Sequence, residues 1–240
     1  MISIETQIQT LSTDSLNIIY ADPPWSYKQK VGNGVLKRKD GTLIYPSMSM
    51  QQLKDLGPEV ERITKDDAAL FMWATMPLIA EALDLIKAWG FKYKTCFVNW
   101  VKTTKDGSRP AFGVGYYTRS NAELCLVAIK GKIASYKIGI PDEPDDPEDS
   151  PNTRLNFLTL LEDSPTPVVM TPRREHSRKP VVVREMITTL LGDLPRVEFF
   201  ARETAHGWTS MGNDINHFEQ SDEQSEEQET KRKCKRPKIK

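Results

Sequence analysis

Short apolar runs typical of buried strands alternate with helical segments along this chain. The strand-like runs are residues 18–21, 68–73, 91–102, 122–131 and 196–202. Helical patterns cover residues 77–90 and 180–192, which each begin with proline and end with glycine, and a shorter helix is predicted at 50–56. Because buried strands that alternate with helices build parallel β-α-β units, we expect an α/β fold with a mostly parallel sheet and helices on both faces.

The length of the chain favours one domain followed by a polar tail. Its 240 residues suffice for one α/β domain and are too few for two of comfortable size. We expect residues 1–218 to form the domain, with a polar lead-in at 1–16, a hairpin turn at Asp40-Gly41 and an acidic, proline-rich loop at 141–151. Residues 219–240 are acidic and then basic, and we expect them to be disordered.

Charge, cysteine content and the length of the apolar runs limit the kinds of site and location to expect for this chain. The formal net charge is zero, so nucleic-acid binding would depend on local basic clusters. The three cysteines show no metal-ligand spacing, so we expect no metal site and an intracellular, reducing location. That location would be the cytoplasm of a prokaryote or phage host, or a eukaryotic nucleus given the basic C-terminal run. No apolar run approaches the ~18 residues of a membrane span, and we expect none.

The segment Asp22-Pro23-Pro24-Trp25 follows the first strand directly, at the position where α/β sheets bind ligands. Prolines in such a place often only end the strand, and a tryptophan often only fills the core. An acceptor-only carboxylate, a rigid proline carbonyl and a flat aromatic ring also match the exocyclic amine of a planar base. Asp22 and the free carbonyl of Pro23 would accept the two amine hydrogens, and Trp25 or Tyr27 would stack on the ring.

Such a site predicts methyl transfer to an adenine amine. Two acceptors would localise the nitrogen lone pair, which is otherwise delocalised into the ring. An activated methyl group placed in line would then supply most of the remaining lowering of the barrier. No metal or covalent intermediate is required.

The motif resembles that of the adenine N6-methyltransferase family typified by the messenger-RNA adenosine methyltransferase catalytic subunit. The resemblance continues in the same order over roughly residues 17–215, through segments 45–56, 113–131, 172–180 and 196–214. It implies a Rossmann-like, S-adenosylmethionine-dependent methyltransferase fold with a permuted motif order, and a small member of the phage or bacterial type.

The resemblance also implies roles for individual residues. Asp22, Pro23, Pro24 and Trp25 would be catalytic, and Lys179 would pair with the cofactor carboxylate. Alone, Lys179 would read as a solvated residue before a helix, and the turn at 213–214 as an ordinary one. A pairing of Arg202 with Glu198 would shape the cofactor pocket, and the cofactor base would meet Glu5 or Asp14. The cofactor-binding residues are expected to be Asp22, Lys179, Arg202, His206, Asn213 and Asp214.

The substrate is expected to be nucleic acid, with DNA favoured over RNA by analogy with small members of the family. Basic clusters at 37–39, 173–174 and 231–240 would neutralise phosphates, although each reads equally as a solvated surface. The substrate-binding residues are expected to be Tyr27, Lys37, Arg38, Lys39 and Arg119. Three alternatives stay open: an RNA substrate, a non-catalytic nucleic-acid-binding subunit that supports a homologous or accessory partner, and a plain nucleotide-binding α/β protein.

Overall fold

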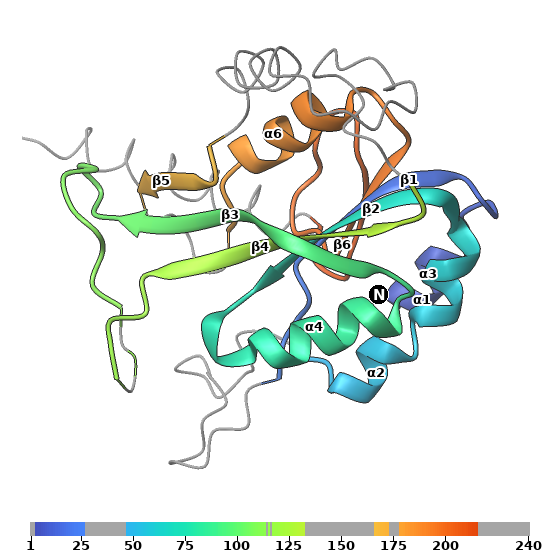
Figure 1. Ribbon diagram of the computed structural model, residues 1–240, viewed down its shortest axis with the longest axis horizontal. Helices are drawn as coiled ribbons and strands as arrows, with labels where there is room; N and C mark the ends of the chain where they lie inside the picture. The colour runs from blue at the N-terminus through green and yellow to red at the C-terminus, as the bar shows by residue number, and fades with distance from the viewer. Residues whose placement is uncertain are drawn as a thin grey trace, which may run out of the picture.

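The structure, a computed structural model, consists of a seven-stranded sheet with helices on both faces (Figure 1). It describes residues 3–26, 47–113, 115, 117–132, 166–172 and 178–215. The strand order is β5-β3-β4-β2-β1-β6-β7. The strands are β1 (Leu16–Ala21), β2 (Thr64–Ala74), β3 (Lys92–Thr103), β4 (Ala122–Lys130), β5 (Val168–Pro172), β6 (Arg196–Phe199) and β7 (Thr209–Met211). The helices are α1 (Ile4–Gln9), α2 (Met50–Lys54), α3 (Gly57–Ile63), η1 (Met76–Leu78), α4 (Ile79–Ala88) and α6 (Val182–Leu191).

The sheet is mostly parallel, as predicted. Strand β4 pairs antiparallel with β2 and with β3, whereas every other neighbouring pair is parallel. The alternating sequence pattern predicts parallel units, but β3 and β4 follow each other without an intervening helix. Because β4 runs against the others, its first residues lie at the edge where the parallel strands end. We call this edge the carboxyl edge.

The sheet separates two hydrophobic cores, one on each of its faces. Helices α1 to α4 cover one face and α6 covers the other, so the predicted coverage of both faces is confirmed (Figure 1). The residues of β1 alternate between the cores: Ile19 and Ala21 face α1 to α4, whereas Ile18 and Tyr20 face α6. Asp22, the next residue in this alternation, continues the row on the α6 face.

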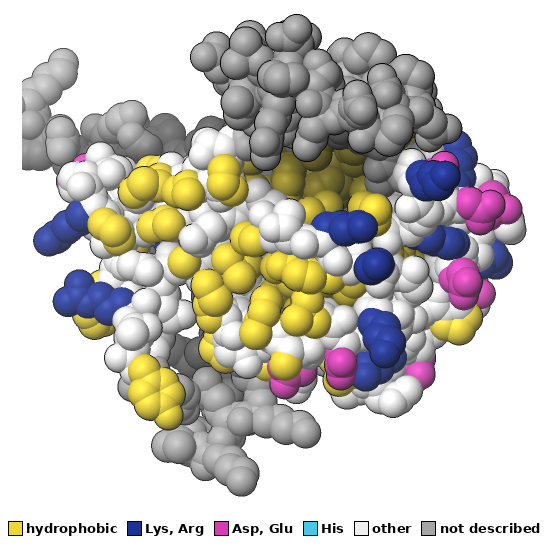
Figure 2. All heavy atoms as spheres, in the orientation of Figure 1, with side chains coloured by type: hydrophobic (Ala, Val, Ile, Leu, Met, Phe, Trp, Pro, Cys, Tyr) yellow, Lys and Arg dark blue, Asp and Glu magenta, His cyan; other side chains and the backbone are white. Residues whose placement is uncertain are grey.

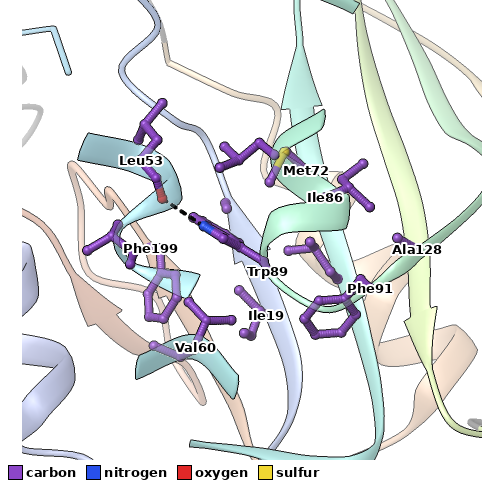
Figure 3. Packing of buried hydrophobic residues seen from close by; sticks show 14 of the residues in the cluster. Ile19, Leu53, Val60, Met72, Ile86, Trp89, Phe91, Ala128 and Phe199 are labelled. Atoms are coloured by element: carbon purple, nitrogen blue, oxygen red, sulfur yellow. Dashed lines mark hydrogen bonds between the residues drawn. The ribbon is translucent and has the colours of Figure 1, made fainter. Parts of the chain in front are cut away.

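Trp89 at the end of α4 is the centre of the larger core (Figure 3). Its ring lies among side chains of α2, α3, β1, β2 and β6, and its indole N–H donates to the Leu53 carbonyl at 2.8 Å. Gly57 begins α3 against the same helix end, and a Cβ there would lie 2.6 Å from the carbonyl oxygen of Ala88. Only a residue without a side chain permits this close approach of α3 to α4.

The structure corrects two sequence expectations in the N-terminal part. Residues 4–9 form α1 rather than a polar lead-in, because Ile4 and Ile8 lie one helical turn apart and both are buried. The helix predicted at 50–56 ends at Lys54, and Gly57-Pro58 begins α3 instead of only ending α2. A proline in the first turn lacks only a hydrogen-bond donor that would have no helical partner. Strands β5 and β7 were not predicted because each is short.

The remaining expectations about domain organisation fall largely outside the described residues. These include the hairpin turn at Asp40-Gly41, the loop at 141–151 and the tail at 219–240. In the described part of the chain no helix has the length and hydropathy of a membrane span.

Candidate functional site

Four charged side chains of alternating sign lie in a row at the carboxyl edge. Lys179, in the segment before α6, donates to Asp22 Oδ2 at 2.8 Å and lies 3.2 Å from Glu123 Oε2. The other carboxylate oxygen of Glu123 accepts from Lys102 at the end of β3. We call Asp22, Lys179, Glu123 and Lys102 the charge row. The sequence predicts Asp22 and Lys179 as site residues, and the structure brings them together across 157 positions of the chain.

Burial and mutual attraction set the ionisation of this row. Burial raises the pKa of Asp22 above its usual value, and Glu123 adds to the effect, while Lys179 and Arg202 oppose it. Burial would also raise the pKa of Glu123, but Lys179 and Lys102 outweigh it and lower that pKa to about 2. Burial would lower the pKa of Lys179, yet Asp22 and Glu123 raise it above its ordinary value. Glu123 and Lys179 therefore stay charged, whereas Asp22 holds a proton more readily than an ordinary aspartate.

Each of the two lysines in the charge row lies over the ring of a tryptophan. The Lys179 ammonium lies 5.4 Å from the centroid of Trp73, and that of Lys102 lies 4.8 Å from Trp100. The two rings meet edge to face at 5.9 Å, and Trp73 Nε1 donates to the buried Tyr20 hydroxyl at 2.6 Å. An aromatic face attracts a cation, so these rings hold both ammonium groups at the edge of the smaller core.

Glu123 and Lys102 were not recognised from the sequence. Glu123 continues the α6-facing row of Cys125 in β4, and Lys102 continues that of Trp100 in β3. The alternation would have placed both side chains on the α6 face. Only the antiparallel direction of β4, which the sequence does not show, brings Glu123 to the same edge as Asp22.

The segment Asp22-Pro23-Pro24-Trp25 is held by its own backbone. The amide of Trp25 donates to the Pro23 carbonyl at 2.8 Å, which is a γ-turn, and the Met48 amide donates to the Pro24 carbonyl at 2.9 Å. The expectation of a free Pro23 carbonyl is therefore wrong, although a carbonyl oxygen has a second lone pair. The half-buried Trp25 ring packs on the larger core and donates to the Trp73 carbonyl at 3.2 Å.

A second, more buried cluster of charges lies beside the charge row. Arg184 of α6 donates to both carboxylate oxygens of Glu198 in β6, at 2.7 and 2.9 Å. It also donates to Glu203 at 3.0 Å, and Arg178 donates to the other oxygen of Glu203 at 3.1 Å. Glu198 thus forms its ion pair with Arg184, whereas a pair with Arg202 was expected, because the long side chain of Arg184 in the first turn of α6 reaches the Glu198 carboxylate. The cluster fixes residue 178, and with it the backbone of Lys179.

The turn after β7 carries Asn213 and Asp214 as exposed side chains at the carboxyl edge. Gln7 of α1 fixes this turn, because its side chain accepts from the Gly212 amide at 3.0 Å and donates to the Gly212 carbonyl at 3.3 Å. A Cβ on Gly212 would lie 2.1 Å from the Ala201 carbonyl oxygen, so the turns after β6 and β7 touch. Gln7 was not recognised from the sequence.

The other predicted site residues are spread more widely. Arg202, after β6, is buried and acts electrostatically on Asp22, and His206 is exposed on the following turn. Asp14 precedes β1 at the opposite edge of the sheet, whereas Glu5 is exposed on α1. Arg119 lies in the loop between β3 and β4. Tyr27, Lys37, Arg38 and Lys39 lie outside the described residues, as do the basic positions 173–174 and 231–240.

The sheet and the charged groups at its carboxyl edge define a Rossmann-like α/β protein, the class that binds ligands beyond the ends of its strands. The sequence pattern of the MT-A70 family matches residues 16–214. The chain therefore belongs to the MT-A70 family.

Individual relatives agree with this assignment. The chain is 32% identical over 211 residues to the type II methyltransferase M.MunI from Mycoplasma sp., covering 82% of this chain and 77% of the relative. It is 26% identical to the N(6)-adenosine-methyltransferase MT-A70-like of Arabidopsis thaliana over 89% of this chain, which is 26% of that longer protein. It is also 26% identical to the N6-methyladenosine RNA methyltransferase MTA1 of Pyricularia oryzae, over 87% of this chain and 49% of the relative. The predicted family, fold and enzyme class, an adenine N6-methyltransferase, are confirmed.

Proposed function

We propose that the chain transfers a methyl group from S-adenosylmethionine to the N6 amine of adenine in DNA. The observation that carries this proposal is the ion pair of Asp22 with Lys179 at the carboxyl edge, where one acceptor and one cation stand side by side. The Asp22 side chain keeps 24% of its surface exposed, so it lies at the strand end and is not enclosed in the core.

The catalytic role falls to the segment Asp22-Pro23-Pro24-Trp25. Asp22 accepts one hydrogen of the amine, and the second lone pair of the Pro23 carbonyl accepts the other. The γ-turn and the Met48 amide hold both prolines, so this geometry exists before the substrate binds. The Trp25 ring lies against the larger core, and it supports the segment from behind.

The described residues fit the cofactor at both of its polar ends. An ammonium has three N–H donors, and the two ion pairs of Lys179 leave a third for the carboxylate of a methionine group. The Gln7-braced turn after β7 presents Asn213 and Asp214 to the vicinal hydroxyls of a ribose. Arg202 and His206 complete the site from the turn after β6. S-adenosylmethionine supplies an electrophilic methyl group on a sulfonium when it is bound.

The chemistry on the protein side concerns the amine and its protons. With the cofactor bound, the N6 lone pair would take the methyl carbon, and the electron pair of the carbon–sulfur bond would stay with sulfur. The nitrogen becomes cationic and must release a proton. Asp22 stabilises that positive charge, and its raised pKa suits the carboxylate to hold the departing proton before water removes it.

Two considerations support DNA as the substrate. The chain is 32% identical to the type II methyltransferase and 26% identical to the plant adenosine methyltransferase, so its sequence is more similar to the former. Small stand-alone members of the family act on DNA by the analogy given above. Contacts with the nucleic acid would come from Tyr27, Lys37, Arg38, Lys39 and Arg119.

The decisive experiment identifies the product. The protein is incubated with labelled S-adenosylmethionine and matched DNA or RNA oligonucleotides, which are then digested to nucleosides. Labelled N6-methyldeoxyadenosine from DNA is the expected result. Label in N6-methyladenosine alone would assign RNA as the substrate. Failure to label either, alone and with a homologous partner subunit added, would refute the enzymatic proposal.

A further inference from the structure

The loop between β3 and β4 projects from the sheet and carries exposed aromatic and basic side chains (Figures 1 and 2). Phe112 keeps 65% of its surface exposed and Tyr117 keeps all of it. The guanidinium of Arg119 lies 4.7 Å from the centroid of the Phe112 ring. Exposed aromatic side chains that gather at one place offer a binding surface, because water solvates them poorly.

A shallow, open depression with a volume of about 270 Å³ lies beside these side chains. Its walls come from Phe112, Gly113, Gly115, Tyr117, Thr118 and Arg119. A Cβ on Gly113 would lie 1.9 Å from the Ser120 carbonyl oxygen, and one on Gly115 would lie 2.2 Å from that of Thr118. The two glycines therefore permit close approaches of the backbone in this loop, and Phe112 and Arg119 contact each other in the wall of the depression.

The loop is anchored at the carboxyl edge. The Ala111 amide donates to the Lys102 carbonyl at 2.7 Å, and the Lys102 amide donates to the Asn121 carbonyl at 2.9 Å. Lys102 and Glu123 both belong to the charge row, so the loop starts and ends beside the site of the target amine. Arg119 precedes Glu123 by four positions, a span of at most ~14 Å along the chain. With nucleotides ~3.4 Å apart along a stacked strand, this distance corresponds to a few nucleotides.

We propose that this loop binds an unpaired nucleobase close to the target adenine, stacked on the planar pair that the ring of Phe112 and the guanidinium of Arg119 form with each other. The inference rests on the proposed function for the presence of an adenine substrate. Every base has a flat π-face that stacks on an aromatic side chain, and a planar guanidinium stacks in the same way. Lys105 and Arg109 are exposed on the same loop and supply positive charge for the adjoining phosphates.

A positively charged, aromatic surface favours a nucleic acid over a protein partner. Lysine is depleted at protein interfaces, whereas the exposed Lys105 on this loop can meet a phosphate. The guanidinium of Arg119 lies 4.7 Å from the centroid of the exposed Phe112 ring, and a base would replace water on the open face of this pair.

The test combines protein variants with DNA substrates that each lack one base. Binding of single-stranded DNA that contains one adenine is measured by fluorescence anisotropy, with an abasic site moved through the neighbouring positions in turn. For the wild-type protein, one abasic position should raise the Kd about tenfold, the effect of losing one base–aromatic contact. In Phe112→Leu the intact DNA should bind about tenfold more weakly, and the same abasic site should have no further effect.

Two controls isolate the contact. Tyr93→Leu removes an exposed aromatic ring at the opposite end of β3 and should leave the Kd and the abasic pattern unchanged. Arg119→Lys keeps the positive charge but removes the planar guanidinium. The rise in Kd caused by the abasic site should therefore become smaller, while the salt dependence of binding is preserved.

Several outcomes would overturn the proposal. One is a wild-type protein that binds every abasic DNA equally well, and another is a Phe112→Leu variant that retains the abasic pattern. A change of oligomeric state in Phe112→Leu with unaltered DNA binding would assign the loop to a protein interface. Binding is measured without turnover, so a failure here is distinct from a failure to methylate.

Discussion

Replacement of Glu123 by glutamine tests whether the charge row holds the carboxyl edge together. The change keeps the shape of the side chain and removes the negative charge that separates Lys102 from Lys179. The lowering of the Glu123 pKa from 4.5 to about 2 corresponds to ~3 kcal/mol in favour of the ionised form in the folded protein. Removing one partner from a buried ion pair typically costs ~3–5 kcal/mol, which agrees with this figure.

We therefore expect Glu123→Gln to lower the free energy of unfolding by ~3 kcal/mol at neutral pH. For a domain of about this size, the melting temperature should fall by ~6–12 °C. The measurement is urea unfolding followed by tryptophan fluorescence, with thermal unfolding as a second readout. Glu61→Gln, the same substitution at an exposed position of α3, should change the stability by less than ~0.5 kcal/mol.

The pH dependence gives a sharper criterion. The folded-state pKa of Glu123 lies below its unfolded value, so its contribution is fully present above pH ~4.5 and is lost as the pH falls toward ~2. The stability difference between wild type and Glu123→Gln should be constant from pH ~7 to ~5.5 and should be smaller by ~1.4 kcal/mol at pH ~3.5. A difference below ~1 kcal/mol at neutral pH, or one that does not shrink on acidification, would refute the electrostatic reasoning.

Three further changes test other parts of the structure. Asp22→Asn should lower the methylation rate at least ~100-fold with the fold retained by circular dichroism, whereas Asp66→Asn, exposed at the opposite edge, should stay active; turnover in the first variant would exclude the proposed role. Glu203→Gln should destabilise the protein by ~3 kcal/mol in urea because the buried Arg184 loses a counter-charge, and a loss under ~1 kcal/mol would mean that Glu198 suffices alone. Gly57→Ala should lower the stability by ~1–3 kcal/mol, since its methyl group would lie 2.6 Å from the carbonyl oxygen at the end of α4; an unchanged melting temperature would show that the helices separate freely.

The position of the site was predictable because it depends on local order along the chain. A buried strand followed by Asp22 places a carboxylate at the carboxyl edge in any parallel sheet, and β1 is such a strand. The long helices were also predictable, because proline and glycine mark their ends. Gly90 and Gly192 take the positive φ angles of 81° and 75° that glycine adopts readily where such helices end.

The partners of the site residues were not predictable, since they depend on strand direction and on helix packing. The sequence of β4 reads the same whether the strand runs parallel or antiparallel, so it could not place Glu123 beside Lys179. The prediction that Arg202 pairs with Glu198 was wrong for a related reason. Arg202 is near in sequence, but α6 delivers Arg184 from across the sheet.

The place of β1 inside the sheet has a consequence for synthesis on the ribosome. Its neighbour on one side, β2, follows within ~50 residues, but its neighbour on the other side, β6, follows only after ~170 residues. At ~5–20 residues per second, one side of β1 waits ~10–35 s for its hydrogen-bonding partner. During that interval the nascent chain exposes one unpaired backbone edge of β1, with the apolar residues Ile18, Ile19 and Tyr20, and another strand can pair with this edge. The speed of translation between these two strands therefore bears directly on how much protein is recovered in native form.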